Sequence, residues 1–295
     1  MTAVASLATA VFCYMIKMII GIEWDSIIKM KLTSNIQSNL SKEYLGRGDF
    51  ELLQQKDGFR FGTDSVLLAW FASSFIHKGV NEVLDLGANC GACSMCVIAR
   101  NSKARVDSVE IMPSAYEVLQ KNIALNKLED RLNAYNADIR DLPMEIKQKS
   151  YDVVMFNPPF FSSERGPKTS DAKTEEVLNA RFEMNGGLED FVKAASARVF
   201  PSKGHVVMVM HGNRLADSIK AFVNCGLSPT RLMTVHPFID KEACMFLLAG
   251  KKDSHTSQLR ILSPLVLNEK DKDGNIVATQ DVIRIYEKEH TDCFI

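Results

Sequence analysis

LDLGANCGAC, residues 84–93, reads as the end of a buried strand that turns through two glycines into a helix. The segment Asn81–Leu86 is apolar enough for an interior strand, and Ala92–Arg100 fits an apolar helix. Gly87 and Gly91 flank the connecting turn, where glycine lets a ligand approach the backbone closely. A plain turn between a strand and a helix would have the same composition, so the interpretation depends on the rest of the chain.

Strand-like and helix-like segments alternate along the rest of the chain, which is typical of a parallel sheet covered by helices. The last two expected strands are joined by a short link and can pair as an antiparallel hairpin. The expected fold is therefore α/β, with a mostly parallel seven-stranded sheet and a terminal antiparallel hairpin. The expected strands are residues 81–86, 105–111, 132–136, 151–156, 205–210, 231–236 and 245–250, and the expected helices are residues 92–100, 113–125, 188–199 and 214–223.

A second stretch, YDVVMFNPPFF at residues 151–161, ends its strand abruptly. Pro158 and Pro159 cannot donate to a strand ladder, so the chain leaves the sheet at the edge where open α/β sheets bind ligands. The Asn157 side chain and the Pro158 backbone each offer a carbonyl that can accept an N–H group of a substrate amino group. Phe160 can stack on a flat substrate. The alternative is that the motif only terminates a strand.

Three acidic residues fall at the ends of three successive expected strands. Asp85 ends the first, Glu110 ends the second and Asp138 follows the third. A carboxylate at the end of the second strand can accept hydrogen bonds from the ribose hydroxyls, and one after the third strand can accept a hydrogen bond from an adenine amino group. Each is an ordinary surface acid when taken alone, but together they describe a nucleoside-binding edge. A nicotinamide-dependent oxidoreductase fits poorly, because the glycine turn does not read G-x-G-x-x-G.

This combination of motifs resembles the class I S-adenosylmethionine-dependent methyltransferases, and NPPF resembles their amino-group methyltransferases. A finer resemblance is to the bacterial tRNA(Val) adenine-N6 methyltransferase family. It rests on DGFRFGTDSVLLAWF (57–71), NPPFF, ARFE (180–183) and a closing PLVL…DG…Y, and it runs from about residue 45 to residue 286.

The resemblance implies a Rossmann-like domain that binds S-adenosylmethionine and methylates an exocyclic amino group without a metal, with adenine N6 in a cytoplasmic tRNA as the favoured acceptor. The resemblance also places Thr63 and Asp64 at the cofactor. The other interpretation is that Thr63 or Asp64 caps the helix that follows them, and both roles can hold together. Two other functions stay open: methylation of a protein glutamine amide, and cofactor binding without catalysis. The implied catalytic residues are Asn157, Pro158, Pro159 and Phe160, and the implied cofactor-binding residues are Asp85, Gly87, Gly91, Glu110, Asp138, Thr63 and Asp64.

One position departs from the family's pattern. The family's turn reads D-L-G-x-G-x-G, and Asn89 replaces the middle glycine. Asparagine tolerates a left-handed backbone better than most residues, so the turn can survive, although the side chain could crowd the cofactor. Asn89 is the reason for the hypothesis that the protein binds the cofactor without catalysing methyl transfer.

The chain has seven cysteines, an odd number without the spacing of secreted domains, which is typical of reduced thiols in a cytosolic protein. Cys90, Cys93 and Cys96 form C-x-x-C-x-x-C, a pattern that three ligands of an iron–sulfur site would also show. Because no fourth cysteine follows nearby, packing of small residues on a helix is the favoured interpretation.

The net charge of −1 gives no global attraction to nucleic acid, so RNA would have to bind a local patch. Residues 162–181 follow the NPPFF motif and carry Arg165, Lys168 and Arg181, which could contact phosphates. Acidic residues in the same stretch fit a plain solvated loop equally well.

The expected organisation is an apolar N-terminal extension (1–30), an N-terminal cap segment (40–79), a catalytic domain (80–250) and a C-terminal appendage packed on it (251–295). Residues 3–22 are nearly all apolar and long enough to span a membrane. They could form an anchor or an extra packed helix. The favoured interpretation is translation from an upstream start, with Met30 as the first residue of the functional protein.

Overall fold

The computed structural model describes residues 39–45, 49–56, 61–76, 81–159, 186–252 and 258–287. The chain divides into two units, Met1–Ser41 and Lys42–Ile295, and apart from Leu40 and Ser41 the residues described below belong to the second. Several expectations lie outside the described residues: the apolar segment 1–30, Phe160, and the basic residues Arg165, Lys168 and Arg181. Within the described part of the chain, the helices are all too short or too polar to cross a bilayer.

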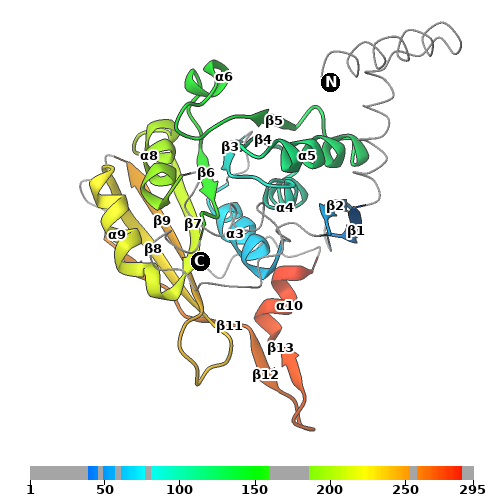
Figure 1. Ribbon diagram of the computed structural model, residues 1–295. Coiled ribbons are helices and arrows are strands. Elements are labelled where there is room, and N and C mark those ends of the chain that lie inside the picture. Colours follow the sequence, from blue (N-terminus) through cyan, green and yellow to red (C-terminus); the bar gives the residue numbers. More distant parts are fainter. Residues whose placement is uncertain are drawn as a thin grey trace, which may run out of the picture. The chain divides into compact units, whose positions relative to one another are not determined.

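A mostly parallel sheet forms the centre of this unit (Figure 1). Its strands are β3 (Asn81–Leu86), β4 (Ala104–Glu110), β5 (Leu132–Asn136), β6 (Val153–Phe156), β7 (His205–His211), β8 (Leu227–His236), β9 (Met245–Lys252), β10 (Arg260–Ile261) and β11 (Leu265–Val266). The order across the sheet is β10-β8-β9-β7-β6-β3-β4-β5, with β11 also paired to β8. The expected seven strands are therefore confirmed, and β10 and β11 add two short parallel strands beside β8.

The expected terminal hairpin is present, but its second strand is inserted into the sheet. Strand β9 lies between β7 and β8 and runs antiparallel to both. Strand β8 also starts at Leu227, four residues before the expected start at residue 231. The ladder has an irregularity between Pro229 and Arg231, where a proline is tolerated although it cannot donate a hydrogen bond.

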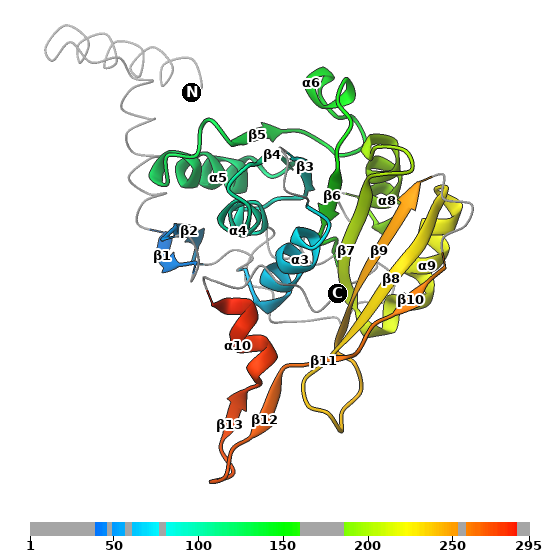
Figure 2. The same ribbon diagram turned by 180° about the vertical axis from the view of Figure 1, so that it is seen from behind.

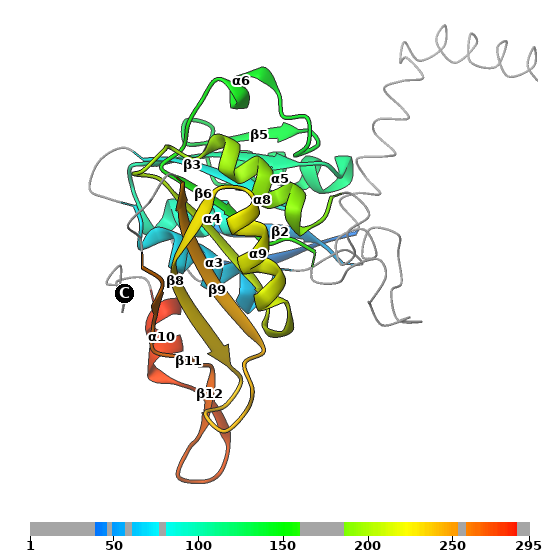
Figure 3. The ribbon, with the colours of Figure 1, turned by 90° about the vertical axis from the view of Figure 1, so that its left-hand side faces the viewer.

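Helices cover both faces of the sheet. On one face lie α3 (Thr63–Ser73), α4 (Ala92–Arg100) and α5 (Pro113–Leu125), and on the other lie α8 (Leu188–Arg198) and α9 (Leu215–Asn224) (Figure 3). Side chains alternate along each strand, so Leu84, Leu86 and Phe156 join one core cluster with Phe191 of α8. The residue between the two leucines, Asp85, therefore faces the side of α4 and bonds to that helix.

Shorter elements connect and extend this core. The strands β1 (Leu40–Tyr44) and β2 (Glu51–Gln55) form a separate two-stranded sheet, and α6 (Met144–Lys147) and a 3-10 turn, η2 (Gly212–Arg214), lie in connections. Near the C-terminus, β12 (Asn268–Lys270) and β13 (Ile276–Ala278) form a hairpin before α10 (Gln280–Tyr286) (Figure 2). The Arg100 side chain donates to the Ile285 backbone carbonyl, which joins α10 to α4.

The strand order reverses direction at β3. The chain moves outward from β3 through β4 to β5, and then returns to place β6 on the other side of β3. Leu86 pairs with Phe156 in this register, so Gly87 and Asn157 leave the sheet next to each other. Such a switch point is where open α/β sheets bind their ligands.

Candidate functional site

The carboxyl edge of four neighbouring strands collects the residues that the sequence singled out. From β5 to β6 along the edge they are Asp138, Glu110, Gly87 and Asn157, because the strand order is β5-β4-β3-β6. Glu110, the last residue of β4, pairs with Asn136, the last residue of β5. Asp138 follows Asn136 by two residues, so it lies just beyond the carboxyl end of β5. Two acids, a glycine turn and an amide side chain therefore follow one another along this edge of the sheet.

The turn after β3 has the left-handed backbone that its glycines suggested. Its φ angles are +72° at Gly87, +49° at Asn89 and +89° at Gly91, so Asn89 adopts the left-handed conformation that asparagine tolerates, and the turn is kept. The Asn89 side-chain carbonyl accepts the Cys90 N–H at 2.7 Å. The side chain is thus folded onto its own turn. The backbone N–H groups of Gly87 and Ala88 both donate to the Val109 carbonyl, which fixes the turn to β4.

Glu110 holds the turn from the end of β4. Its Oε2 accepts the Asn89 N–H at 2.8 Å, and its Oε1 accepts the Met112 N–H at 2.7 Å. Burial raises the pKa of this carboxyl, while the backbone hydrogen bonds oppose the rise. Each carboxylate oxygen has a second lone pair, so Glu110 can still accept hydroxyl protons from a ribose.

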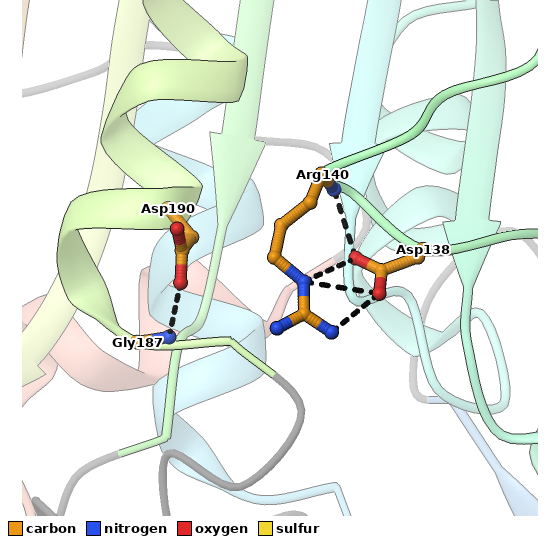
Figure 4. Close-up of polar contacts among 4 residues, drawn as sticks. All are labelled: Asp138, Arg140, Gly187 and Asp190. Carbon is orange, nitrogen blue, oxygen red and sulfur yellow. Dashed lines mark hydrogen bonds and ion pairs between the residues drawn. The ribbon is translucent and has the colours of Figure 1, made fainter.

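Asp138 is held by an arginine two residues along the chain (Figure 4). Its Oδ1 accepts the Arg140 N–H at 2.8 Å and the Nε–H at 2.9 Å, and its Oδ2 accepts the Nη2–H at 2.5 Å. These hydrogen bonds lower the pKa of Asp138, so the carboxylate is ionised at neutral pH. In the same view, Asp190 accepts the Gly187 N–H at 3.0 Å at the start of α8.

Asp85 lies below the edge rather than on it. Its side chain is 2% exposed, and its Oδ2 accepts the Ser94 hydroxyl at 2.6 Å. The Ser94 hydroxyl also lies 2.7 Å from that of Ser108 on β4. Asp85 therefore joins β3, β4 and α4 beneath the glycine turn. Burial raises the pKa of Asp85 to about 7, against the Ser94 hydrogen bond and with a contribution from the Glu110 charge.

We expect the raised pKa of Asp85 to make stability depend on pH. An unfolded aspartate titrates near 3.8, so between about pH 4 and 7 the folded protein holds a proton that the unfolded chain has lost. The free energy of unfolding therefore falls as the pH rises through this window. Asp85→Asn mimics the protonated acid and should remove the decline, so that its stability relative to the wild type increases by a few kcal/mol between pH 5 and pH 8.

Urea denaturation at pH 5, 6, 7 and 8 measures this difference. Asp138→Asn is the matched control, because the lowered pKa of Asp138 affects stability only in more acidic solution. A difference between wild type and Asp85→Asn that stays constant from pH 5 to pH 8 would contradict the prediction.

Asn157, directly after β6, contacts the start of α3. Its Nδ2 donates to Oδ2 of Asp64 at 2.8 Å, and its Oδ1 is buried and has no hydrogen-bond partner among the described residues. The second Asp64 oxygen, Oδ1, accepts the Ser65 N–H at 2.8 Å. The suggestion that Thr63 or Asp64 caps α3 is wrong: the N-cap is Gly62, and no side chain makes a capping hydrogen bond there. The Asp64 carboxylate instead bonds within the first turn and to Asn157.

The three clustered cysteines are packed around the start of α4. Cys93 and Cys96 lie within the helix, Cys90 lies in the turn before it, and all three are buried. Burial raises the pKa of Cys90 to about 12 and that of Cys93 well above its usual range. The helix-packing interpretation is confirmed by these positions. No group of three potential ligands suited to a metal ion occurs among the described residues.

These thiols should resist alkylation in the folded protein, because the thiolate is the reactive form and burial suppresses it. We expect Cys225 and Cys244, which are partly exposed, to react with iodoacetamide before any of the three buried cysteines. Mass spectrometry of peptides from native and urea-treated protein would show this order. Rapid modification of the native Cys90–Cys96 stretch would contradict it.

Two positioning residues escaped the sequence analysis. Asn122 of α5 accepts the Leu53 N–H at 2.7 Å and donates to the carbonyls of Leu53 and Cys90 at 2.9 and 2.8 Å. Asn126, one turn later, exchanges a similar pair of hydrogen bonds with the Glu51 backbone. Together they fix β2 to α5, and Asn122 supports the glycine turn. The sequence feature that could have indicated them is the spacing of the two asparagines, because residues four apart lie on the same side of a helix.

Comparison with protein families and curated proteins identifies relatives of this chain. Residues 72–170 match the family model described as the TRM5/TYW2 methyltransferase domain. The tRNA1(Val) (adenine(37)-N6)-methyltransferase of Porphyromonas gingivalis is 30% identical over 196 residues, which cover 65% of this chain and 74% of that protein.

Comparison with solved structures supports the fold. A predicted O-methyltransferase from Agrobacterium tumefaciens superimposes with a TM-score of 0.58 and 22% identity, covering 76% of this chain and 95% of that one. The tRNA m1G37 methyltransferase of M. jannaschii gives a TM-score of 0.52 and 19% identity, covering 73% of this chain and 57% of the other. Both are named as methyltransferases, and the shared fold together with the mostly parallel sheet confirms the expected Rossmann-like fold class.

Proposed function

The chain belongs to the family of the tRNA1(Val) (adenine(37)-N6)-methyltransferases, and from this premise we propose that it methylates the N6 amino group of an adenine in tRNA. The methyl donor is S-adenosylmethionine, and no metal takes part. A tRNA substrate places the reaction in the cytoplasm. Residues 80–250 form the catalytic part, with 40–79 as a cap segment and 251–295 as an appendage packed on it.

One observation carries the proposal: at the switch point of the sheet, a buried side-chain acceptor has no partner in the part of the chain that the structure describes. Asn157 Oδ1 is that acceptor, and Gly87 leaves the sheet beside it. An unpaired buried carbonyl is costly, so its retention favours a function in which a ligand supplies the donor. An exocyclic amino group offers two N–H donors and would satisfy it.

The edge also fits the adenosine part of the cofactor. Glu110 would accept hydrogen bonds from the ribose hydroxyls. Asp138 would accept one from the adenine amino group in place of the longer, shared contact that Arg140 Nε makes with its Oδ2 at 3.0 Å. Gly87 and Gly91 would let the ligand approach the turn, while Asp85 supports that turn from beneath. The absence of a lysine or arginine from residues 84–93 suits a ligand without a phosphate at this point.

The protein's own groups would act by orienting the substrate amino group. Bound S-adenosylmethionine supplies the methyl group from a sulfonium, which leaves as a neutral thioether. The adenine amino lone pair is delocalised into the ring, so acceptors for its N–H groups are needed to direct that lone pair outward. Asn157 Oδ1 and the Pro158 carbonyl would be these acceptors, with Pro159 holding the latter. The nitrogen gives its lone pair to the new bond and releases one proton to solvent.

The contacts with RNA remain proposals for residues outside the described part of the chain. Phe160 would stack on the target base, which must be extruded from its neighbours to reach the edge. Arg165, Lys168 and Arg181 would contact phosphates near that base.

Methyl transfer from labelled S-adenosylmethionine to a tRNA(Val) transcript tests the proposal. The curated relative is named for adenine 37, so the matched control is the same transcript with guanine at that position. We expect N6-methyladenosine from the first transcript and no label in the second. Label in protein but not in RNA would favour the glutamine amide alternative. Cofactor binding without transfer to RNA or protein would favour the non-catalytic scaffold.

A further inference from the structure

We propose that Asp64 is a positioning residue that fixes the orientation of the Asn157 side-chain amide, so that its carbonyl oxygen faces the target amino group. The inference rests on the proposed function and deepens it, because it explains how the acceptor is oriented before the substrate binds. It also assigns Asp64 a role different from the cofactor contact that the family resemblance implied.

The hydrogen-bonding chemistry allows only one orientation of the amide. An ionised carboxylate only accepts hydrogen bonds, so the group that faces Asp64 Oδ2 at 2.8 Å must be the Asn157 NH2 group. The reversed amide would place two acceptor oxygens against each other at this distance. The carbonyl oxygen therefore points to the other side, where it is buried and where the described segments supply no donor to it.

The orientation matters because the two ends of an amide have opposite effects on an amino substrate. The carbonyl end accepts the substrate N–H, whereas the NH2 end would face it donor to donor. An asparagine without a fixed partner can present either end, and only one of them is productive. A fixed orientation is the preorganisation that acceptors at a reacting group require.

The structure holds Asp64 itself firmly. Its second oxygen accepts the Ser65 N–H at 2.8 Å in the first turn of α3, where the helix dipole favours a negative charge. The Ser65 carbonyl accepts the Cys93 thiol at 3.5 Å, which ties this turn to α4. A Cβ at Gly62 would lie 3.0 Å from Asp64 Oδ1, so glycine at the N-cap leaves the room that the carboxylate needs in this position.

Two substitutions separate positioning from cofactor binding. Asp64→Ala removes the partner of the Asn157 NH2 group, and we expect kcat for tRNA methylation to fall about 10- to 100-fold, the effect of losing one hydrogen bond to a charged group. The dissociation constant of S-adenosylmethionine, measured by calorimetry, should stay within about twofold, which is less than half a kcal/mol. Asp64→Asn leaves one acceptor oxygen for two donors, the Ser65 N–H and the Asn157 NH2 group, so it should also lower kcat.

Asp138→Asn is the matched control, because it changes an acid proposed to bind the cofactor. It should weaken cofactor binding, whereas Asp64→Ala should not. The inference is overturned if Asp64→Ala weakens cofactor binding as much as it lowers activity, or if it leaves kcat unchanged.

Amide orientation can be measured without any methyl transfer, which separates this inference from the proposed function. In protein with ¹⁵N-labelled asparagine, one Asn157 NH2 proton should exchange slowly with solvent, and the Asn157→Ala variant identifies its signal. The protection should disappear in Asp64→Ala and persist in Asp138→Asn. If the protection follows this pattern in an enzyme that does not methylate tRNA, the positioning stands and the proposed substrate fails. If tRNA is methylated but Asp64→Ala leaves the protection intact, the positioning fails alone.

Discussion

Asn157→Ala should abolish most of the methyl transfer while leaving the cofactor bound. The substitution removes the buried Oδ1 that would accept the substrate amino group, and this acceptor is aligned before the substrate arrives. Losing one preorganised hydrogen-bonding group at a reacting centre typically lowers kcat by about 100- to 1,000-fold. The cofactor acids Glu110 and Asp138 are unchanged, so the dissociation constant of S-adenosylmethionine should stay near that of the wild type.

Single-turnover methylation of tRNA, with cofactor binding measured in parallel, checks this result. Asn133→Ala is the matched control, because Asn133 Nδ2 bonds to Asp107 at 2.8 Å within the sheet and not at its carboxyl edge. We expect that control to lose stability but to keep kcat within a few fold. Retention of wild-type kcat by Asn157→Ala would overturn the proposed chemistry, even if tRNA were methylated.

The sequence predicted the carboxyl edge of the sheet because its signals are local. The end of a strand can be predicted from the residues that follow it. Gly87 follows one strand, and Asn157 with two prolines follows the other, and glycine and proline both disfavour continuation of a strand. Strands that alternate with helices must then run parallel, which brings these ends to one edge. The same logic placed Glu110 and Asp138 there, and the register confirmed their neighbouring positions.

Other features depend on contacts between distant segments, which no local pattern encodes. The bond from Asn157 to Asp64 spans 93 residues, so Asp64 was interpreted as a cofactor contact or a helix cap and not as a partner of Asn157. Asp85 ends a strand like the other acids, but alternation along β3 turns its side chain toward Ser94 beneath the edge. The insertion of β9 between β7 and β8 is likewise a matter of sheet order, because a short link is compatible with either position for the last strand.

Gly91→Ala should be the most damaging substitution in the glycine turn. Its φ of +89° is unfavourable for any residue with a Cβ, and that Cβ would lie 2.4 Å from Cδ1 of Leu119. The left-handed backbone costs about 1–2 kcal/mol and overpacking about 1–3 kcal/mol, so we expect a loss of about 2–5 kcal/mol in the free energy of unfolding. Because Gly91 is also the N-cap of α4, the shift should reach Asn89 and Glu110 and weaken cofactor binding.

Two further variants separate backbone strain from the clash. Gly274 has a similar φ of +84° with nothing within 4 Å of its added Cβ, so Gly274→Ala should cost only the strain and leave cofactor binding unchanged. Leu119→Val removes the atom that the new Cβ would meet. In that background, Gly91→Ala should therefore cost about 1–2 kcal/mol, the strain alone. Urea denaturation of the four proteins in this cycle measures the coupling. If Gly91→Ala costs the same in both backgrounds, the clash with Leu119 is not its cause, and the conformation of the turn alone requires glycine.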